Sequence, residues 1–238
     1  MIFLYILGVI LEIILLLVAF FGICALTVDT KKEYNTYNRF FRRVFIIAVA
    51  IVKWVLRIKT HETGMEKLPD GKFLVVGNHR SMFDPVVSFY AFRKHYLGFV
   101  SKPSNFKIPL FGRMAQKCCF MPIDRENPRN ALKAINRAAD IISSDTACMT
   151  VYPEGTRSKT GELLEFHNGV FKIAQKANVP IVVVALRGTE QIGKNYIRRR
   201  TDVYHDIVEV IPVEDVQKMK SDELGDRIRA SLMEKLGK

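Results

Sequence analysis

The sequence is poor in acidic residues: 24 Asp and Glu stand against 36 Lys and Arg, giving a formal net charge of +12. This balance excludes an acidic, self-repelling chain and favours negatively charged partners such as nucleic acid, anionic lipid or phosphorylated substrates. Internal repeats and low-complexity segments are also missing, which argues against a repeat architecture. With 16 Phe and 8 Tyr among 238 residues, the composition favours one or two folded domains over disorder.

Cysteine is scarce as well, with four residues at positions 24, 118, 119 and 148. An adjacent pair and wide gaps fit neither a disulfide framework nor the spacing of a zinc site. The simpler interpretation is free thiols in a reducing compartment, with Cys118 and Cys119 packed in the core.

Charged side chains are almost missing from residues 1–28, where Glu12 is the single exception. This stretch exceeds the roughly 20 apolar residues that a helix needs to span a bilayer. A secretory signal peptide is the alternative, but a basic segment before the apolar run is missing and no small-residue cleavage site is clear. We therefore expect a retained membrane helix.

Residues 29–60 reverse this pattern and are rich in Lys and Arg. Five basic residues fall within about 100° of one another on a helical wheel: Arg39, Arg42, Arg43, Lys53 and Arg57. A basic stripe beside aromatic residues is typical of a helix lying in the interface of an anionic membrane, and the alternative is a helix packed on a domain. We expect residues 1–60 to form a two-helix membrane anchor and residues 61–238 a domain on the cytoplasmic side of the cell membrane, by the positive-inside rule.

The rest of the chain alternates between strand and helix patterns. Strands are predicted at 73–78, 96–100, 119–123, 148–153, 179–186 and 203–213, and helices at 84–92, 109–118, 127–144, 170–177 and 221–236. This alternation predicts an α/β fold with a mixed, mostly parallel central sheet flanked by helices.

The stretch GNHRSMFDP (77–85) places His79 where a predicted strand ends and Asp84 where a helix begins. Ligands bind at such strand-to-helix turns in α/β folds. Five positions apart, the two side chains meet only if the loop folds one back on the other. The carboxylate would then fix the imidazole tautomer and leave the other nitrogen free to take a proton. The alternative for Asp84 is a plain helix cap.

A second group of candidates lies in YPEGTRS (152–158). Gly155 allows the backbone to approach a ligand, Thr156 can donate, and Arg157 can bind a phosphate with two hydrogen bonds. Glu154 could hold that arginine or a substrate hydroxyl. Further positive charge comes from Lys102, Lys107 and Arg125. Taken singly, each charged residue is better explained as solvated surface.

Taken in order, these blocks resemble the four conserved blocks of the glycerolipid acyltransferase superfamily. They are N-H-x4-D-P, K-P-x5-P-x-x-G with F-x-x-I-D-R, Y-P-E-G-T-R-S and V-P-I-V-x-V-A, within residues 75–186. The sequence is most similar to the 1-acylglycerol-3-phosphate acyltransferases. It departs from the family pattern at Cys118 and Cys119, where small glycines are usual, and at Tyr152, which replaces a phenylalanine.

The resemblance implies a role for each matched residue. His79 would be the general base and Asp84 its partner; Arg125, Glu154, Gly155 and Arg157 would bind the glycerol phosphate, and Pro180 would help to shape the acyl site. From their own chemistry, Lys102 and Thr156 are added to the expected substrate-binding residues. The implied substrates are lysophosphatidic acid, which is acylated at its sn-2 hydroxyl, and a thioester of CoA or of acyl carrier protein. The membrane bilayer is the expected partner, and neither nucleic acid, a cofactor nor a metal is expected.

Three alternatives remain open at this point. The acceptor could be another lysophospholipid or glycerol 3-phosphate itself, because an arginine recognises a phosphate group and not the rest of the molecule that bears it. A membrane-anchored scaffold that binds anionic lipid or nucleic acid would explain the charge but not the His79 and Asp84 pairing. A hydrolase with Ser81 as nucleophile would lack the usual G-x-S-x-G turn.

Overall fold

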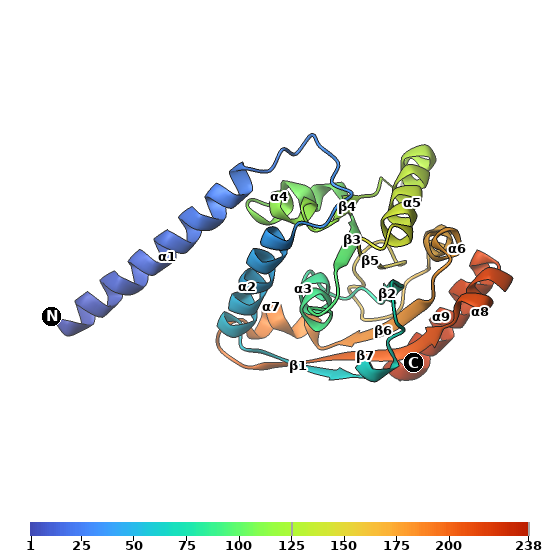
Figure 1. Ribbon diagram of the computed structural model, residues 1–238. Coiled ribbons are helices and arrows are strands. Elements are labelled where there is room, and N and C mark those ends of the chain that lie inside the picture. Colours follow the sequence, from blue (N-terminus) through green and yellow to red (C-terminus); the bar gives the residue numbers. More distant parts are fainter. Residues whose placement is uncertain (125, 238) are drawn as a thin grey trace.

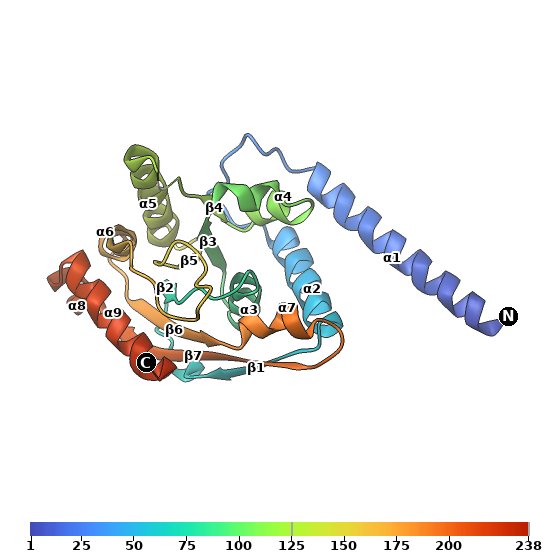
Figure 2. The same ribbon diagram turned by 180° about the vertical axis from the view of Figure 1, so that it is seen from behind.

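The computed structural model describes residues 1–124 and 126–237, in which a mixed seven-stranded sheet lies between two layers of helices (Figures 1 and 2). In spatial order the strands are β1 (Ile58–Thr63), β7 (Thr201–Ile211), β6 (Ile181–Arg187), β2 (Leu74–Gly77), β5 (Cys148–Val151), β3 (Leu97–Ser101) and β4 (Met121–Pro122). The pairing of β6 with β7 is antiparallel, and the other neighbouring pairs are parallel. The predicted α/β class with a mostly parallel sheet is confirmed.

Each face of the sheet is covered by its own set of helices. One side carries α2 (Arg39–Val55), α3 (Asp84–Ala91), α4 (Phe111–Gln116) and α7 (Ile192–Asn195), and the other carries α5 (Pro128–Ser143), α6 (Lys172–Ala177), α8 (Val213–Lys218) and α9 (Ser221–Leu236). Short 3₁₀ turns complete the described chain: η1 (Met65–Lys67), η2 (Pro103–Lys107), η3 (Asn168–Phe171) and η4 (Thr189–Gln191).

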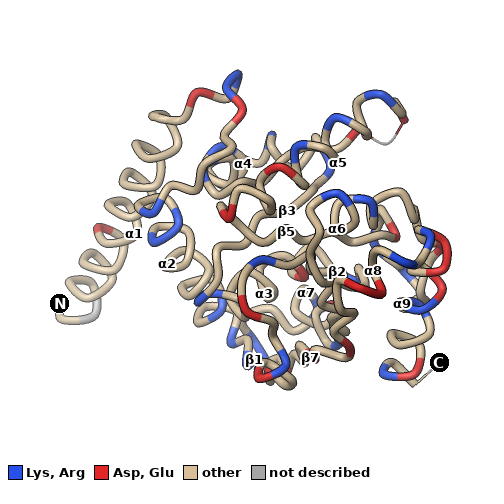
Figure 3. Tube along the Cα trace, turned by 45° about the vertical axis from the view of Figure 1, so that its right-hand side comes forward, with Lys and Arg blue, Asp and Glu red and all other residues tan. Residues whose placement is uncertain are grey.

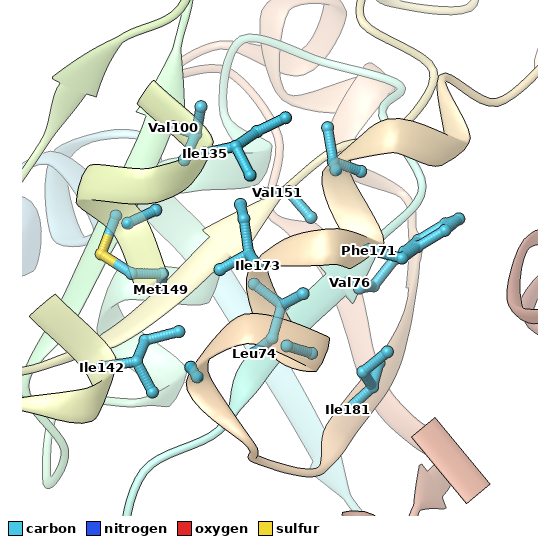
Figure 4. Packing of buried hydrophobic residues seen from close by; sticks show 14 of the residues in the cluster. Leu74, Val76, Val100, Ile135, Ile142, Met149, Val151, Phe171, Ile173 and Ile181 are labelled. Carbon is cyan, nitrogen blue, oxygen red and sulfur yellow. The ribbon is translucent and has the colours of Figure 1, made fainter. Parts of the chain in front are cut away.

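Alternate residues of each strand divide the core into two clusters. In β2, Leu74 and Val76 point to the α5–α6–α9 side, whereas Val75 packs with α2 and α3. Figure 4 shows the first cluster, where Ile135, Phe171 and Ile173 close over the sheet. Burial on both faces explains why the central strands are nearly continuous apolar runs.

The helix α1 (Ile2–Leu26) projects away from the α/β layers, and few charged residues lie along it (Figures 1 and 3). Residues Leu4–Leu26 are long and apolar enough to cross a membrane, by length and composition. Among the side chains of this helix that the structure describes, the buried ones are Cys24 and Ala25, in its last turn.

Helix α2 is part of the α/β core, which differs from the expected interfacial helix. Phe41 and Phe45 are buried, and the Phe45 ring meets the Phe89 ring edge-on with centroids 4.8 Å apart. The alternative of a helix packed on the domain therefore describes its inner face, while Trp54 on the outer face is exposed. The expected boundary at residue 60 falls inside β1, so the first strand of the sheet begins before the residue at which the anchor was expected to end. The sequence analysis did not predict this strand.

His205, in β7, is a fully buried histidine whose ring meets Phe92 edge-on. Burial lowers the pKa of His205 from 6.5 to about 4. Above pH 6.5 the ring is neutral whether the chain is folded or not; below it, the unfolded chain takes up the proton first. We therefore expect stability to fall between pH 6.5 and about 4, by on the order of 3 kcal/mol from this residue. Urea unfolding of the wild type and of His205→Leu between pH 6.5 and about 4 measures this loss of stability, which should be smaller in the variant. If the free energy of unfolding depended on pH equally in both proteins, His205 would not be its source.

Candidate active site

The loop that follows β2 folds His79 back onto the first residue of α3. His79 Nδ1 lies 2.7 Å from Asp84 Oδ2, and the same oxygen accepts hydrogen bonds from the backbone N–H groups of Arg80 at 2.6 Å and Ser81 at 2.7 Å. Asp84 is 0% exposed. The carboxylate therefore holds the loop and the imidazole together, which explains how an acid and a base five positions apart can meet. His79 Nε2 remains for a substrate.

Thr189 completes the surroundings of Asp84 and was missed by sequence reasoning. Its hydroxyl donates to Asp84 Oδ1 at 2.5 Å, and its side chain is fully buried. Thr189 opens η4 directly after Gly188, whose φ of 85° is favourable only for glycine. A side-chain Cβ at Gly188 would lie 2.5 Å from the Asp202 carbonyl oxygen. The turn after β6 thus aims a donor at the free oxygen of the carboxylate.

We expect Thr189→Val to lower kcat about tenfold with KM nearly unchanged, because the buried Asp84 oxygen loses its hydrogen bond and no longer holds the imidazole in one orientation. Steady-state kinetics of the valine and serine variants check this. Thr189→Ser keeps the hydroxyl and should restore most of kcat. Equal losses in both variants would instead indicate a packing defect.

Tyr152 forms a stacked platform for the imidazole. Its ring lies parallel to that of His79, with centroids 4.6 Å apart and an interplanar angle of 13°. The ring is buried, and its hydroxyl donates to Ser88 Oγ at 3.4 Å. Burial raises the pKa of Tyr152 well above 10, so the phenol stays neutral. The aromatic ring, which a phenylalanine would also supply, accounts for the stacking.

The segment 154–158 clamps the main chain of His79 from both sides. The Glu154 carboxylate accepts from the backbone N–H of His79 at 2.6 Å and from that of Leu164 at 3.0 Å, and the N–H of Ser158 donates to the His79 carbonyl at 2.9 Å. Burial raises the pKa of Glu154. The expectation that Glu154 binds substrate therefore needs correction: both carboxylate oxygens are engaged by the backbone, and its geometry is that of a positioning residue.

A cleft of about 590 Å³ opens beside His79. Its apolar wall comes from η2, α4 and the neighbouring strands: Phe99, Phe106, Phe111, Ala115 and Phe120. Its polar lining includes Lys102, Gly155, Thr156 and Arg157, so four of the predicted substrate-site residues lie together with His79. Aromatic and aliphatic walls suit an acyl chain, and the cationic side chains suit an anion.

Two predicted site residues do not join this group. The Pro180 carbonyl accepts from the Leu74 N–H at 3.1 Å, where β2 and β6 begin, whereas His79 follows the opposite end of β2. Because the two strands are parallel, Pro180 lies at the far edge of the sheet, and the prediction that it shapes the acyl site is wrong. Arg125 lies outside the described residues.

The unusual cysteine pair lies in the core. Cys118 and Cys119 are fully buried, and burial raises the pKa of both thiols, that of Cys119 to about 12. A thiol that stays protonated at neutral pH is a poor nucleophile, so packing explains the pair.

An oriented His–Asp pair at the strand ends of an α/β sheet, beside a cleft with an anion-binding side and an apolar side, defines a group-transfer type of site. The family model described as Acyltransferase matches residues 59–187, which is more than half of the chain. The chain belongs to this acyltransferase family.

Relatives and a solved structure agree with this membership. A chloroplastic 1-acyl-sn-glycerol-3-phosphate acyltransferase of Brassica napus is 31% identical over 208 residues, covering 85% of this chain and 58% of the relative. One from Streptococcus pneumoniae is 25% identical over 198 residues, with 82% and 69% covered. The crystal structure of the 1-acyl-sn-glycerophosphate acyltransferase PlsC of Thermotoga maritima shares the fold, with a TM-score of 0.67 at 20% identity and with 92% of this chain and 86% of that one covered. The chain spans less than three fifths of the length of the first plant relatives.

Proposed function

We propose that this protein transfers a fatty acyl group from a thioester to the sn-2 hydroxyl of 1-acyl-sn-glycerol 3-phosphate, giving phosphatidic acid. The observation that carries the proposal is the His79–Asp84 pair at a cleft lined by both aromatic and cationic side chains. An amphiphilic acceptor with a phosphate needs both kinds of lining. The names of the relatives, 1-acyl-sn-glycerol-3-phosphate acyltransferases, support the same reaction.

In the proposed mechanism His79 acts as general base. Its Nε2 takes the proton of the acceptor hydroxyl while the oxygen attacks the thioester carbonyl. Collapse of the tetrahedral intermediate breaks the carbon–sulfur bond, and the imidazolium returns the proton to the leaving thiolate. Asp84, buried and held by Thr189 and the loop backbone, keeps the imidazole in one tautomer and stabilises its charged form. The thioester is already activated, so this route needs no acyl-enzyme.

The proposed acceptor site combines Lys102, Thr156 and Arg157, with Arg125 as a further candidate from the sequence. An arginine fork matches phosphate geometry, and Gly155, with a φ of 72°, lets the chain turn close to a ligand without a side chain in the way. The donor is a thioester of CoA or of acyl carrier protein. With α1 in the bilayer, the basic residues that follow it favour the cytoplasmic side for the catalytic domain, by the positive-inside rule.

The direct test supplies purified full-length protein with lysophosphatidate and either thioester and detects phosphatidate by mass spectrometry. Glycerol 3-phosphate and other lysophospholipids serve as competing acceptors, and His79→Ala is the negative control. Product from lysophosphatidate that vanishes in the variant supports the proposal, and the active thioester identifies the donor. Product from a different acceptor alone would overturn the acceptor while keeping the reaction class.

Arg157→Ala should raise KM for the acceptor about 10- to 100-fold with a smaller effect on kcat, because a charge-assisted contact to the phosphate is lost. The KM of Arg157→Lys should lie between those of the wild type and Arg157→Ala, since a lysine keeps the charge but cannot form the two parallel hydrogen bonds of a guanidinium. The matched control is Lys159→Ala, an exposed cation two positions away that does not line the cleft. An unchanged KM in Arg157→Ala would place the phosphate elsewhere.

A further inference from the structure

The segment between α7 and β7 exposes apolar and basic side chains together. Tyr196 and Ile197 are 57% and 53% exposed, and Lys194, Arg198 and Arg199 are exposed around them. Within the described residues no acidic side chain forms an ion pair with these three cations. The segment therefore presents unneutralised positive charge and bare apolar surface at one place.

This segment is joined to the end of α2. The Arg57 guanidinium donates to the Arg198 carbonyl at 3.4 Å, and the Thr201 N–H donates to the Arg57 carbonyl at 3.1 Å. Trp54, in the last turn of α2, is 80% exposed. Figures 1 and 2 both show α7 beside this end of α2, on the side of the domain from which α1 projects. We call Trp54, Lys194, Tyr196, Ile197, Arg198 and Arg199 the α7 patch.

One residue of the α7 patch, Tyr196, combines a strained backbone with an exposed side chain. Tyr196 has a φ of 45°, in the left-handed region that a non-glycine residue rarely adopts. A bulky aromatic residue in this conformation costs free energy, and with more than half of the residue exposed its packing in the folded chain is incomplete. Strained backbone of this kind is found where a segment has a functional role, and here it holds an aromatic ring at the surface, open to a partner.

We infer that the α7 patch is a second membrane contact, seated on an anionic bilayer beside α1. Trp and Tyr favour the membrane–water interface, and Lys and Arg are attracted to anionic headgroups. The rings would lie about 5–10 Å into the headgroup region, with the cations above them. Together with α1, this contact would fix the orientation of the domain on the bilayer. The inference does not depend on which acceptor is acylated.

The single tryptophan of the chain offers a direct probe. Full-length protein is reconstituted in vesicles of equimolar phosphatidylglycerol and phosphatidylcholine, with brominated or unbrominated acyl chains. We expect bromine to lower the Trp54 fluorescence about twofold, as for a ring in the interface. Trp54→Phe combined with Tyr196→Trp moves the probe into the loop, where the same loss is expected. An unquenched tryptophan at position 196 would overturn the inference.

Charge reversal tests the electrostatic part with the protein still held by α1. Lys194→Glu, Arg198→Glu and Arg199→Glu together should abolish the quenching at position 196 and leave turnover in detergent micelles unchanged. The matched control reverses Lys172, Lys218 and Lys220, which are exposed on the other face of the sheet, and should keep the quenching. Equal losses of quenching in both triple variants would also overturn the inference. So would a change in the fluorescence of the tryptophan at position 196 on adding acyl carrier protein, with none from brominated lipid.

Discussion

Replacing His79 with alanine is expected to lower kcat about 10²- to 10⁴-fold, the contribution that a positioned general base makes to a proton-transfer step. The side chain is 18% exposed at the cleft, and its Nδ1 is already committed to Asp84, so only Nε2 can take a substrate proton. Removing the ring removes the base without removing the loop, because the loop is held through backbone groups.

Thermal unfolding separates this loss from misfolding. The His79 N–H still donates to Glu154 and its carbonyl still accepts from Ser158 in the alanine variant, since both contacts use the main chain. We expect a stability loss of about 1 kcal/mol or less, from the lost stacking on Tyr152. His167→Ala, at an exposed histidine, is the matched control. An alanine variant at position 79 that folds and keeps its kcat would eliminate His79 as the base.

The sequence placed His79 and Asp84 in one site through the resemblance of their block to the acyltransferase superfamily, whereas spacing alone left a plain helix cap open for Asp84, the first residue of α3. The central strands could also be predicted from the sequence, because a strand buried on both faces is a nearly continuous apolar run, unlike a strand with one exposed face. Strand β1 was missed because Ile58–Thr63 is polar and lies at the edge of the sheet, so its pattern is not that of a buried strand.

The residues that the sequence did not reveal act through long-range contacts. Thr189 is 105 positions from Asp84, and only the pairing of β2 with β6 brings the two turns together. The same pairing explains the error at Pro180, since the start and the end of a strand lie at opposite edges of the sheet. Glu154 was predicted to bind substrate because it is a charged residue in a block expected to bind substrate. In the structure its two carboxylate oxygens accept hydrogen bonds from the backbone N–H groups of His79 and Leu164.

Helix α2 shows a different limit of sequence patterns. A helix with aromatic and basic faces fits a membrane interface and a domain surface equally well, because both present an apolar side and a polar side. The partners decide between them, and the rings that cover Phe45 come from α3, α4 and the chain just before β4. No local pattern could have identified those partners.

Asp84 is the second position where we expect a large effect, and here charge and scaffolding can be separated. Asp84→Asn keeps an oxygen for the N–H groups of Arg80 and Ser81, and its amide can donate to Thr189, whose hydroxyl can turn to accept. The variant should therefore fold. It loses the negative charge that stabilises the imidazolium, so kcat should fall about 10²- to 10⁴-fold.

Asp84→Ala removes the scaffold as well as the charge. Four donors lose their acceptor in a site that is 0% exposed: His79 Nδ1, the N–H groups of Arg80 and Ser81, and the Thr189 hydroxyl. With roughly 1–3 kcal/mol for each buried group left unpaired and strong coupling among them, we expect a loss of about 3–5 kcal/mol in the free energy of unfolding. Denaturant unfolding and kinetics of both variants check the pair of expectations. If alanine were no less stable than asparagine, the hydrogen bonds to Asp84 would not be what holds the loop, and the carboxylate would serve the imidazole alone.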